Sequence, residues 1–229
     1  MKPTYLIYAK RTPIARLGGL LTPVRVDDLM AHLIKDFMTE NYFDHSLIDD
    51  VIVGCANQAG EDNRNLGRMA AVLAELPFEV PGMTINRLCA SSLDSVIDAT
   101  ARINMGLGDC YLVGGAESMT RAPLVVSKGS APFGRDSKLY DTTFGWRFPN
   151  PKMEELFPLF GMGETAEEVA SLHNIEREDQ DQFALDSHLK AVAAVKNGSF
   201  KNEIISVPVK LRKKDYVVSA DEGPREDTS

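Results

Sequence analysis

Hydrophobic positions in the first half of the chain follow two alternating periods. Apolar residues recur every three to four positions over 26–43, 65–76 and 90–105, which predicts three amphipathic helices. Short runs rich in β-branched and apolar residues at 4–9, 50–54, 84–88 and 110–113 predict strands. Strands that alternate with helices of this length indicate βαβ units. We therefore expect an α/β fold in which helices cover both faces of a mostly parallel sheet.

The pattern changes after about Ser118. Residues 120–160 are rich in Pro, Gly and aromatic residues and show no sustained period, over a length that exceeds an ordinary connection. Two helices are predicted beyond them, one introduced by a capping-box pair of Thr165 and Glu168, and one over 178–196. An extended segment with a basic turn follows. The chain thus divides into two predicted parts, 1–118 and 119–229.

Composition narrows the class of protein. The 229 residues are 44% hydrophobic and 25% charged, which is typical of a soluble globular protein. A net charge of −8 argues against a general nucleic-acid or anionic-membrane binder, although a local basic patch can still hold an anionic cofactor. No stretch approaches the ~18 apolar residues of a membrane span. We expect a cytoplasmic protein.

The three cysteines are few and far apart. Their odd number and the absence of CxxC spacing argue against a disulfide framework or a structural zinc site, and no metal is expected. A free cysteine is commonly a small buried hydrophobe, and Cys55 and Cys110 fit that interpretation. Cys89 differs, because it stands between a predicted strand and a predicted helix in "PGMTINRLCASSLDSV". The unpaired N–H groups at a helix N-terminus favour a thiolate, so Cys89 is a candidate nucleophile.

No base for this nucleophile is visible. A nucleophilic cysteine needs a histidine or an equivalent group within hydrogen-bond reach. None of the four histidines stands in a Gly-rich or strand-end context; they are His32, His45, His173 and His188. Ser91 and Ser118 also lie outside a G-x-S-x-G pattern and are better explained as small residues at tight packing points.

Several segments together resemble one family. They are "AKRTPIARLGG", "NRLCASSLDSV", "GGAESMTRAP" and "MGETAEEVA", and the likeness runs in collinear order over essentially the whole chain. The family is the thiolases, acyltransferases that make or cleave 3-oxoacyl-CoA. "GCANQAGEDNRNLGRMA" and "FGWRFPNP" are similar to the 3-oxoadipyl-CoA type.

The resemblance implies a specific architecture. We expect the N-terminal half of a thiolase-like mixed sheet with helices on both faces at 1–118, lacking its last strand. Residues 119–229 would form an α-rich loop domain for CoA binding and oligomerisation. The resemblance further implies a homodimer or homotetramer. The net charge already argues against a nucleic-acid or membrane partner, and we expect neither.

The resemblance also implies a mechanism. Cys89 would attack an acyl-CoA and carry the acyl group as a thioester, after which CoA or the carbanion of a second acyl-CoA attacks. CoA and acyl-CoA, such as acetyl-CoA and 3-oxoacyl-CoA, would be substrates rather than bound cofactors. The family's histidine base and second cysteine belong to a C-terminal domain, and no G-H-P, N-E-A-F or C-x-G-G-G segment occurs here. We therefore expect a fragment that does not turn over alone.

Two further site residues follow from the resemblance. Met162 matches the family position beside the acyl group, although Gly161 stands where many thiolases have histidine. Arg225 matches an arginine that packs by the CoA nucleotide, and an exposed loop arginine is the alternative interpretation. A basic run could attract CoA phosphates or form a solvated turn; it comprises Lys210, Arg212, Lys213 and Lys214.

Two other functions stay open. The chain could be a non-catalytic CoA-binding or assembly module of thiolase fold, which uses CoA affinity or dimerisation without chemistry. It could also be a free-standing cysteine hydrolase, for which no histidine is suitably placed.

Overall fold

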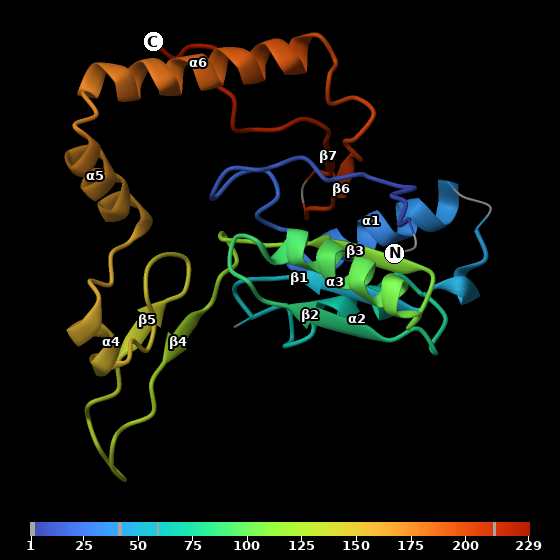
Figure 1. Cartoon of the computed structure of the whole chain (residues 1–229), viewed down its shortest axis with the longest axis horizontal. Coiled ribbons are helices and arrows are strands. Elements are labelled where there is room, and N and C mark those ends of the chain that lie inside the picture. Colours follow the sequence, from blue (N-terminus) through green and yellow to red (C-terminus); the bar gives the residue numbers. More distant parts are fainter. Residues whose placement is uncertain (1–2, 41–42, 59, 213) are drawn as a thin grey trace. The chain divides into compact units, whose positions relative to one another are not determined.

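The computed structural model describes residues 3–40, 43–58, 60–212 and 214–229 (Figure 1). The chain divides into two compact units. The first unit comprises Met1–Arg121 and Phe200–Gly223, and the second comprises Ala122–Ser199 and Pro224–Ser229. Residues 200–223 therefore pack with the first unit, whereas the predicted division of the chain was a single break after residue 118.

A three-stranded sheet forms the centre of the first unit. Its strands are β1 (Asp50–Gly54), β2 (Gly82–Ile85) and β3 (Tyr111–Gly115), in the order β2-β1-β3. Both strand pairs are parallel. The resemblance implied a mixed sheet; in the described residues, the strand pairs of this sheet are parallel.

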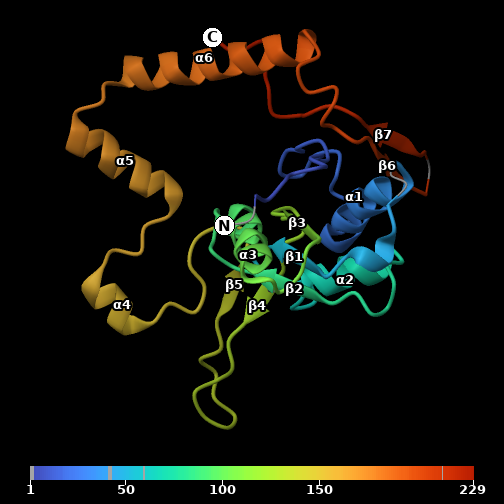
Figure 2. The same ribbon diagram turned by 45° about the vertical axis from the view of Figure 1, so that its right-hand side comes forward.

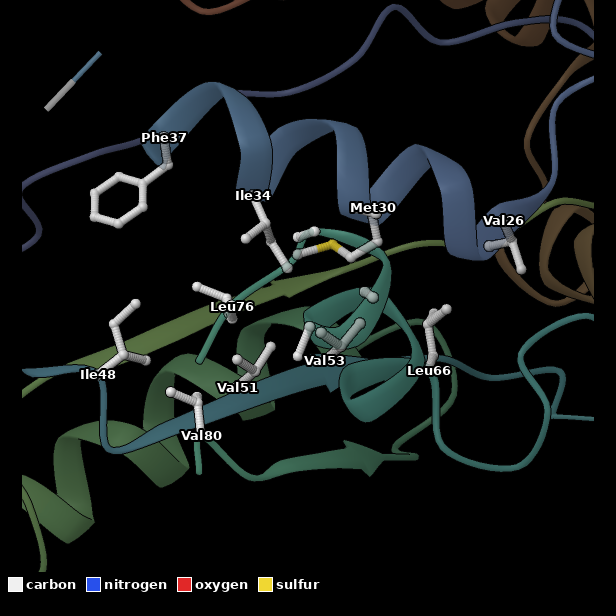
Figure 3. Packing of buried hydrophobic residues seen from close by; sticks show 14 of the residues in the cluster. Val26, Met30, Ile34, Phe37, Ile48, Val51, Val53, Leu66, Leu76 and Val80 are labelled. Atoms are coloured by element: carbon white, nitrogen blue, oxygen red, sulfur yellow. The ribbon is translucent and has the colours of Figure 1, made fainter. Parts of the chain in front are cut away.

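Helices cover both faces of this sheet, which confirms the predicted α/β class. They are α1 (Val26–Glu40), α2 (Leu66–Leu73) and α3 (Ser91–Met105). Helices α1 and α2 lie against one face and α3 against the other (Figures 1, 2 and 3). A short 3₁₀ helix, η1 (His45–Leu47), precedes β1.

The main core lies between β1 and helices α1 and α2 (Figure 3). All five residues of β1 are buried, as expected for a central strand covered on both faces. Val51 and Val53 belong to the same apolar cluster as Ile34 of α1 and Leu66 of α2. Each such side chain contributes about 1.5–3 kcal/mol through burial. Gly67 allows α2 to approach closely, because a Cβ there would lie 2.7 Å from the Val51 carbonyl oxygen.

The predicted strand at 4–9 does not form in the described residues. This segment pairs with none of the three strands of the sheet. Tyr5, Leu6 and Ile7 are 73–76% exposed. The segment, β3 and α3 line a cavity of about 790 Å³.

The C-terminal part of the first unit forms a hairpin of β6 (Val207–Val209) and β7 (Tyr216–Val218). Its buried valines pack with Leu21 in a second small apolar cluster. Arg11 forms ion pairs with Asp221 at 2.7 Å and with Glu203 at 2.8 Å. These contacts join residues 200–223 to the first loop of the chain.

The second unit contains a hairpin and three helices. Its elements are β4 (Leu124–Val126), β5 (Leu139–Asp141), α4 (Pro151–Leu156), α5 (Met162–His173) and α6 (Arg177–Lys196). The predicted capping box of Thr165 and Glu168 is wrong, since α5 begins at Met162 and Thr165 lies inside it. Instead, the Glu164 carboxylate accepts a hydrogen bond from the Gly161 N–H at 2.7 Å. No helix in the described part of the chain has the length and apolar character needed to cross a membrane.

Candidate active site

Cys89 lies in a five-residue turn, 86–90, that joins β2 to α3. Cys89 is exposed, and the next residue, Ala90, is the N-cap of α3. The predicted position between a strand and a helix N-terminus is therefore the observed one. The partial positive charge of the first α3 N–H groups lies next to the turn.

Side chains within the turn hold it in an uncommon backbone shape. Leu88 has φ +50°, in the left-handed region that residues other than glycine rarely adopt. The Leu88 N–H donates to Asn86 Oδ1 at 2.9 Å. The Leu88 carbonyl accepts from the N–H of Ser91 at 3.0 Å and from its Oγ–H at 2.6 Å. The backbone next to Cys89 is thus fixed from both sides.

Ser91 serves this turn rather than the chemistry. It is 4% exposed, and its Oγ also accepts a hydrogen bond from the Arg87 N–H at 2.8 Å. A hydroxyl that is buried and used twice is unavailable as a nucleophile. The Arg87 guanidinium forms an ion pair with Asp94 of α3 at 2.9 Å, which ties the turn to the helix.

The other two cysteines have different surroundings. Cys55 is 2% exposed, and burial, followed by the negative charges of Glu117 and Asp62, raises the pKa of its thiol to about 12. Cys110 is partly buried, and burial also raises its pKa. Both fit the interpretation as small packed side chains. All three cysteines are unpaired.

A second turn follows β1 and contacts the Cys89 turn. The Glu117 carboxylate accepts hydrogen bonds from the N–H groups of Ala56 at 2.8 Å and Asn57 at 3.1 Å, and lies 3.6 Å from the Cys55 Sγ. The Ala56 carbonyl accepts from the Asn86 side-chain amide at 3.0 Å. Sequence reasoning missed Asn86 and Glu117. Their signal was that each follows a strand, and the carboxyl ends of parallel strands meet at one edge.

No histidine of the first unit serves as a base for Cys89 in the described residues. His32 lies on α1 with its Nε2 2.9 Å from the Ser206 carbonyl oxygen. His45 begins the 3₁₀ helix η1. Neither forms a hydrogen bond with Cys89 in the part of the chain that the structure describes.

The predicted CoA-binding residues belong to the second unit, so their positions are described separately from Cys89. Met162 is the first residue of α5 and is 82% exposed. Arg225 is exposed; its N–H donates to His188 Nδ1 at 3.2 Å and its Nη2 donates to Thr228 Oγ1 at 3.3 Å.

The basic run lies between β6 and β7 of the first unit. Lys210, Arg212 and Lys214 are exposed there, and Lys213 lies outside the described residues. Among the residues that the structure describes, no group of three or more His, Cys, Asp or Glu side chains is arranged to hold a metal ion.

Comparisons with known proteins agree on one family. A sequence model described as "Thiolase, N-terminal domain" matches residues 4–229. The chain is 49% identical over 231 residues to a "Beta-ketoadipyl-CoA thiolase" of Acinetobacter baylyi, and this match covers 100% of the chain and 58% of the relative. It is 50% identical over 220 residues to a "3-oxoadipyl-CoA/3-oxo-5,6-dehydrosuberyl-CoA thiolase" of Escherichia coli, which covers 96% of the chain and 54% of that relative.

A solved structure has the same fold. The crystal structure of the Bacillus anthracis acetyl-CoA acetyltransferase matches with a TM-score of 0.84 and 31% identity. The match covers 96% of this chain and 55% of that chain. The chain thus spans a little more than half the length of the proteins it matches.

Proposed function

Because the chain belongs to the thiolase family, we propose that it is the nucleophile-bearing part of an acyl-CoA acyltransferase, in which Cys89 carries the acyl group. The observation that supports this most directly is an exposed thiol in a fixed turn at the start of α3. Small neighbours such as Ala90 leave space for a thioester carbonyl next to the helix N-terminus. There the N–H groups favour negative charge on sulfur or oxygen.

The proposed first step is a transfer between two sulfur atoms. The Cys89 sulfur attacks the carbonyl carbon of an acyl-CoA, a new carbon–sulfur bond forms, and the bond to the CoA sulfur breaks. The proton lost by Cys89 ends on the departing CoA thiol, so the step is balanced. In condensation, the carbanion of a second acyl-CoA attacks the thioester carbonyl, a carbon–carbon bond forms, and Cys89 leaves as the thiolate. Thiolysis is the reverse of condensation followed by acyl transfer: Cys89 attacks the 3-oxo carbon of a 3-oxoacyl-CoA, the bond between C2 and C3 breaks, and the departing acyl-CoA carbanion takes a proton. CoA then takes the acyl group from Cys89.

We propose 3-oxoadipyl-CoA or a similar 3-oxoacyl-CoA as the substrate class, because relatives at 48–50% identity carry such names. CoA would be a substrate and not a permanently held cofactor. Met162 would line the acyl group and Arg225 the CoA nucleotide, within a loop domain formed by 122–199 and 224–229. Their exposure leaves both side chains available for such contacts.

The base would come from sequence that the relatives have beyond the matched region. The first unit offers no histidine bonded to Cys89 in its described part, and the family places its base and second cysteine in a C-terminal domain. We therefore expect no turnover from residues 1–229 alone. We further propose a homodimer or homotetramer in the cytoplasm, where three unpaired cysteines suit reducing conditions.

A chimera tests this function. Residues 1–229 are fused to the part of the Acinetobacter baylyi relative that lies beyond its match, and thiolysis of acetoacetyl-CoA and of 3-oxoadipyl-CoA by CoA is followed by absorbance. The chimera is expected to turn over, while residues 1–229 alone are not. Cys89→Ser should lower the chimera's rate at least about 1,000-fold, because it removes the nucleophile.

A matched control is Cys110→Ser, which changes a cysteine outside the turn and should retain activity. Turnover by residues 1–229 alone at a rate typical of thiolases would refute the proposal that the base lies outside these residues. A chimera that binds CoA but does not react would favour the non-catalytic module instead.

A further inference from the structure

The direction of the Cys89 side chain depends on the residue before it. Leu88 has φ +50°, a conformation that is sterically unfavourable for a residue with a Cβ. Local contacts must compensate for this cost if the turn is to stay in one shape. The contact on the N-terminal side is made by Asn86, whose Oδ1 accepts the Leu88 N–H at 2.9 Å.

The other end of the Asn86 amide reaches a different turn. Its Nδ2 donates to the Ala56 carbonyl at 3.0 Å, so one side chain bridges the turns that follow β1 and β2. The orientation of an amide that both donates and accepts is defined at two points, which a single contact would not achieve.

The turn that contains Ala56 is itself held from β3. Glu117, which follows β3, accepts the N–H groups of Ala56 and Asn57 at 2.8 and 3.1 Å. Hydrogen bonds to a carboxylate are stronger than those between neutral groups. The contacts therefore run from the end of β3, across the end of β1, to the turn after β2.

We propose that Asn86 is a positioning residue for Cys89, with Glu117 as the anchor of the turn on which Asn86 rests. This inference rests on the proposed function, in which Cys89 is the nucleophile. Asn86 and Glu117 are exposed in this chain, so their hydrogen bonds are of modest strength and a moderate effect is expected. Neither residue is required to touch a substrate.

The test measures the second-order rate of Cys89 alkylation by iodoacetamide at pH 7, resolved by peptide mass spectrometry. Asn86→Ala is expected to lower this rate about five-fold, because loss of one neutral hydrogen bond lowers the population of the observed turn conformation by about that factor. Adding Leu88→Gly to Asn86→Ala should restore the rate, because glycine adopts positive φ without a steric cost. A merely structural role of Asn86 would not produce this rescue.

A double-mutant cycle separates the anchor from the positioning residue. Glu117→Gln should also slow alkylation, and its effect should largely vanish in the Asn86→Ala background, because both act through one set of contacts. The matched control is Glu222→Gln. Glu222 holds the 16–20 loop in the same way, by accepting the N–H groups of Arg16 at 3.2 Å and Leu20 at 2.9 Å. This control should leave Cys89 alkylation unchanged.

The outcomes distinguish the two proposals. Failure to label Cys89 selectively in the unaltered chain would overturn the proposed function. Selective labelling with an unchanged rate in Asn86→Ala would overturn only the positioning role. If circular dichroism shows that Asn86→Ala is unfolded, Asn86→Asp replaces it. That variant keeps the acceptor for Leu88 and loses the donor to Ala56, so a rate equal to that of the unaltered chain would overturn the inference.

Discussion

Cys55 and Cys89 follow neighbouring strands at the same edge of the sheet, yet their thiols differ in availability. Cys55 is enclosed and faces the Glu117 carboxylate, so its neutral form is favoured. Cys89 lies on the exposed side of a turn that is fixed by other side chains. The Cys55 sulfur is therefore packed in the core, and the Cys89 sulfur is accessible to solvent.

This difference predicts selective alkylation. Cys55 is enclosed, and burial raises the pKa of its thiol to about 12, so it carries almost no thiolate at pH 7. Iodoacetamide at pH 7 should label Cys89 at least about 1,000-fold faster than Cys55. Labelling of Cys55 should rise about tenfold per pH unit up to pH 10. Equal labelling of all three cysteines at pH 7, read by mass spectrometry, would contradict this prediction.

The position of Cys89 could be predicted because its signal is local, a strand pattern followed at once by a helical pattern. The residues that fix its turn could not be predicted in the same way. Glu117 is 61 residues from Ala56 in sequence, and only the folded sheet brings them together. A polar residue after a strand indicates that a hydrogen bond or a site lies at that edge of the sheet, but the sequence does not show which residue it contacts.

Strand β1 and helix α3 match their predicted ranges to within one residue. Strand β1 was predictable because it is a continuous buried run. The apolar period of α3 predicted the helix but not its buried face, since the buried residues are Ser91, Ser95 and Ala99 while Leu93, Val96 and Ile97 are exposed. Hairpin β4–β5 was missed, since each strand has three residues, two of them exposed, which is too short for a period to be recognised in the sequence. The start of α5 was misplaced because Gly161 and Glu164 form the cap, and a glycine N-cap has no side chain to mark it.

Close packing of α2 on the sheet predicts that position 67 must be glycine. A Cβ at Gly67 would lie 2.7 Å from the Val51 carbonyl oxygen, and backbone cannot yield as a flexible side chain does. Gly67→Ala should therefore lower the free energy of unfolding by at least about 2 kcal/mol, despite the better helix propensity of alanine. Urea denaturation followed by circular dichroism measures this change.

Gly163 in α5 is the matched control. It is also a helical glycine, but no atom lies within 4 Å of the position of its Cβ. Gly163→Ala should leave the unfolding free energy unchanged or raise it by about 0.5–1 kcal/mol. A loss in this variant as large as in Gly67→Ala would show that steric contact is not the cause.

At the scale of the whole chain, residues 200–223 return to the first unit after the second unit has been traversed. Arg11 contacts Asp221 over 210 residues of sequence and Glu203 over 192. No periodicity or turn chemistry contains such information, so the sequence-based division into 1–118 and 119–229 did not include this return. The contact is set by complementary charge in the folded state.

The Arg11–Asp221 pair predicts a pH-dependent contribution to stability. Hydrogen bonding to Arg11 lowers the pKa of Asp221, whose side chain is 10% exposed. The stabilisation is therefore present at neutral pH and is lost as the pH falls below about 4 through the pKa of the folded state. Asp221→Asn should lower the unfolding free energy by about 1–3 kcal/mol at pH 7, with the difference shrinking in acid.

Asp181→Asn provides the comparison. Asp181 pairs with Arg177 on α6, and both side chains are well exposed, so this variant should leave the stability unchanged. Thermal melts at pH 7 and at pH 3 would test both variants. A difference between Asp221→Asn and the unaltered chain that grows in acid would contradict the assignment.

The return of residues 200–223 has a consequence for synthesis on the ribosome. Asp221 is added to the growing chain 210 residues after Arg11. At roughly 5–20 residues per second, the nascent chain waits on the order of 10–40 seconds before this pair can close. During that interval, the part of the first unit that precedes Ala122 must stay folded without the Arg11–Asp221 ion pair. Residues 122–199 are synthesised in the same interval, as an insertion between the two segments of the first unit.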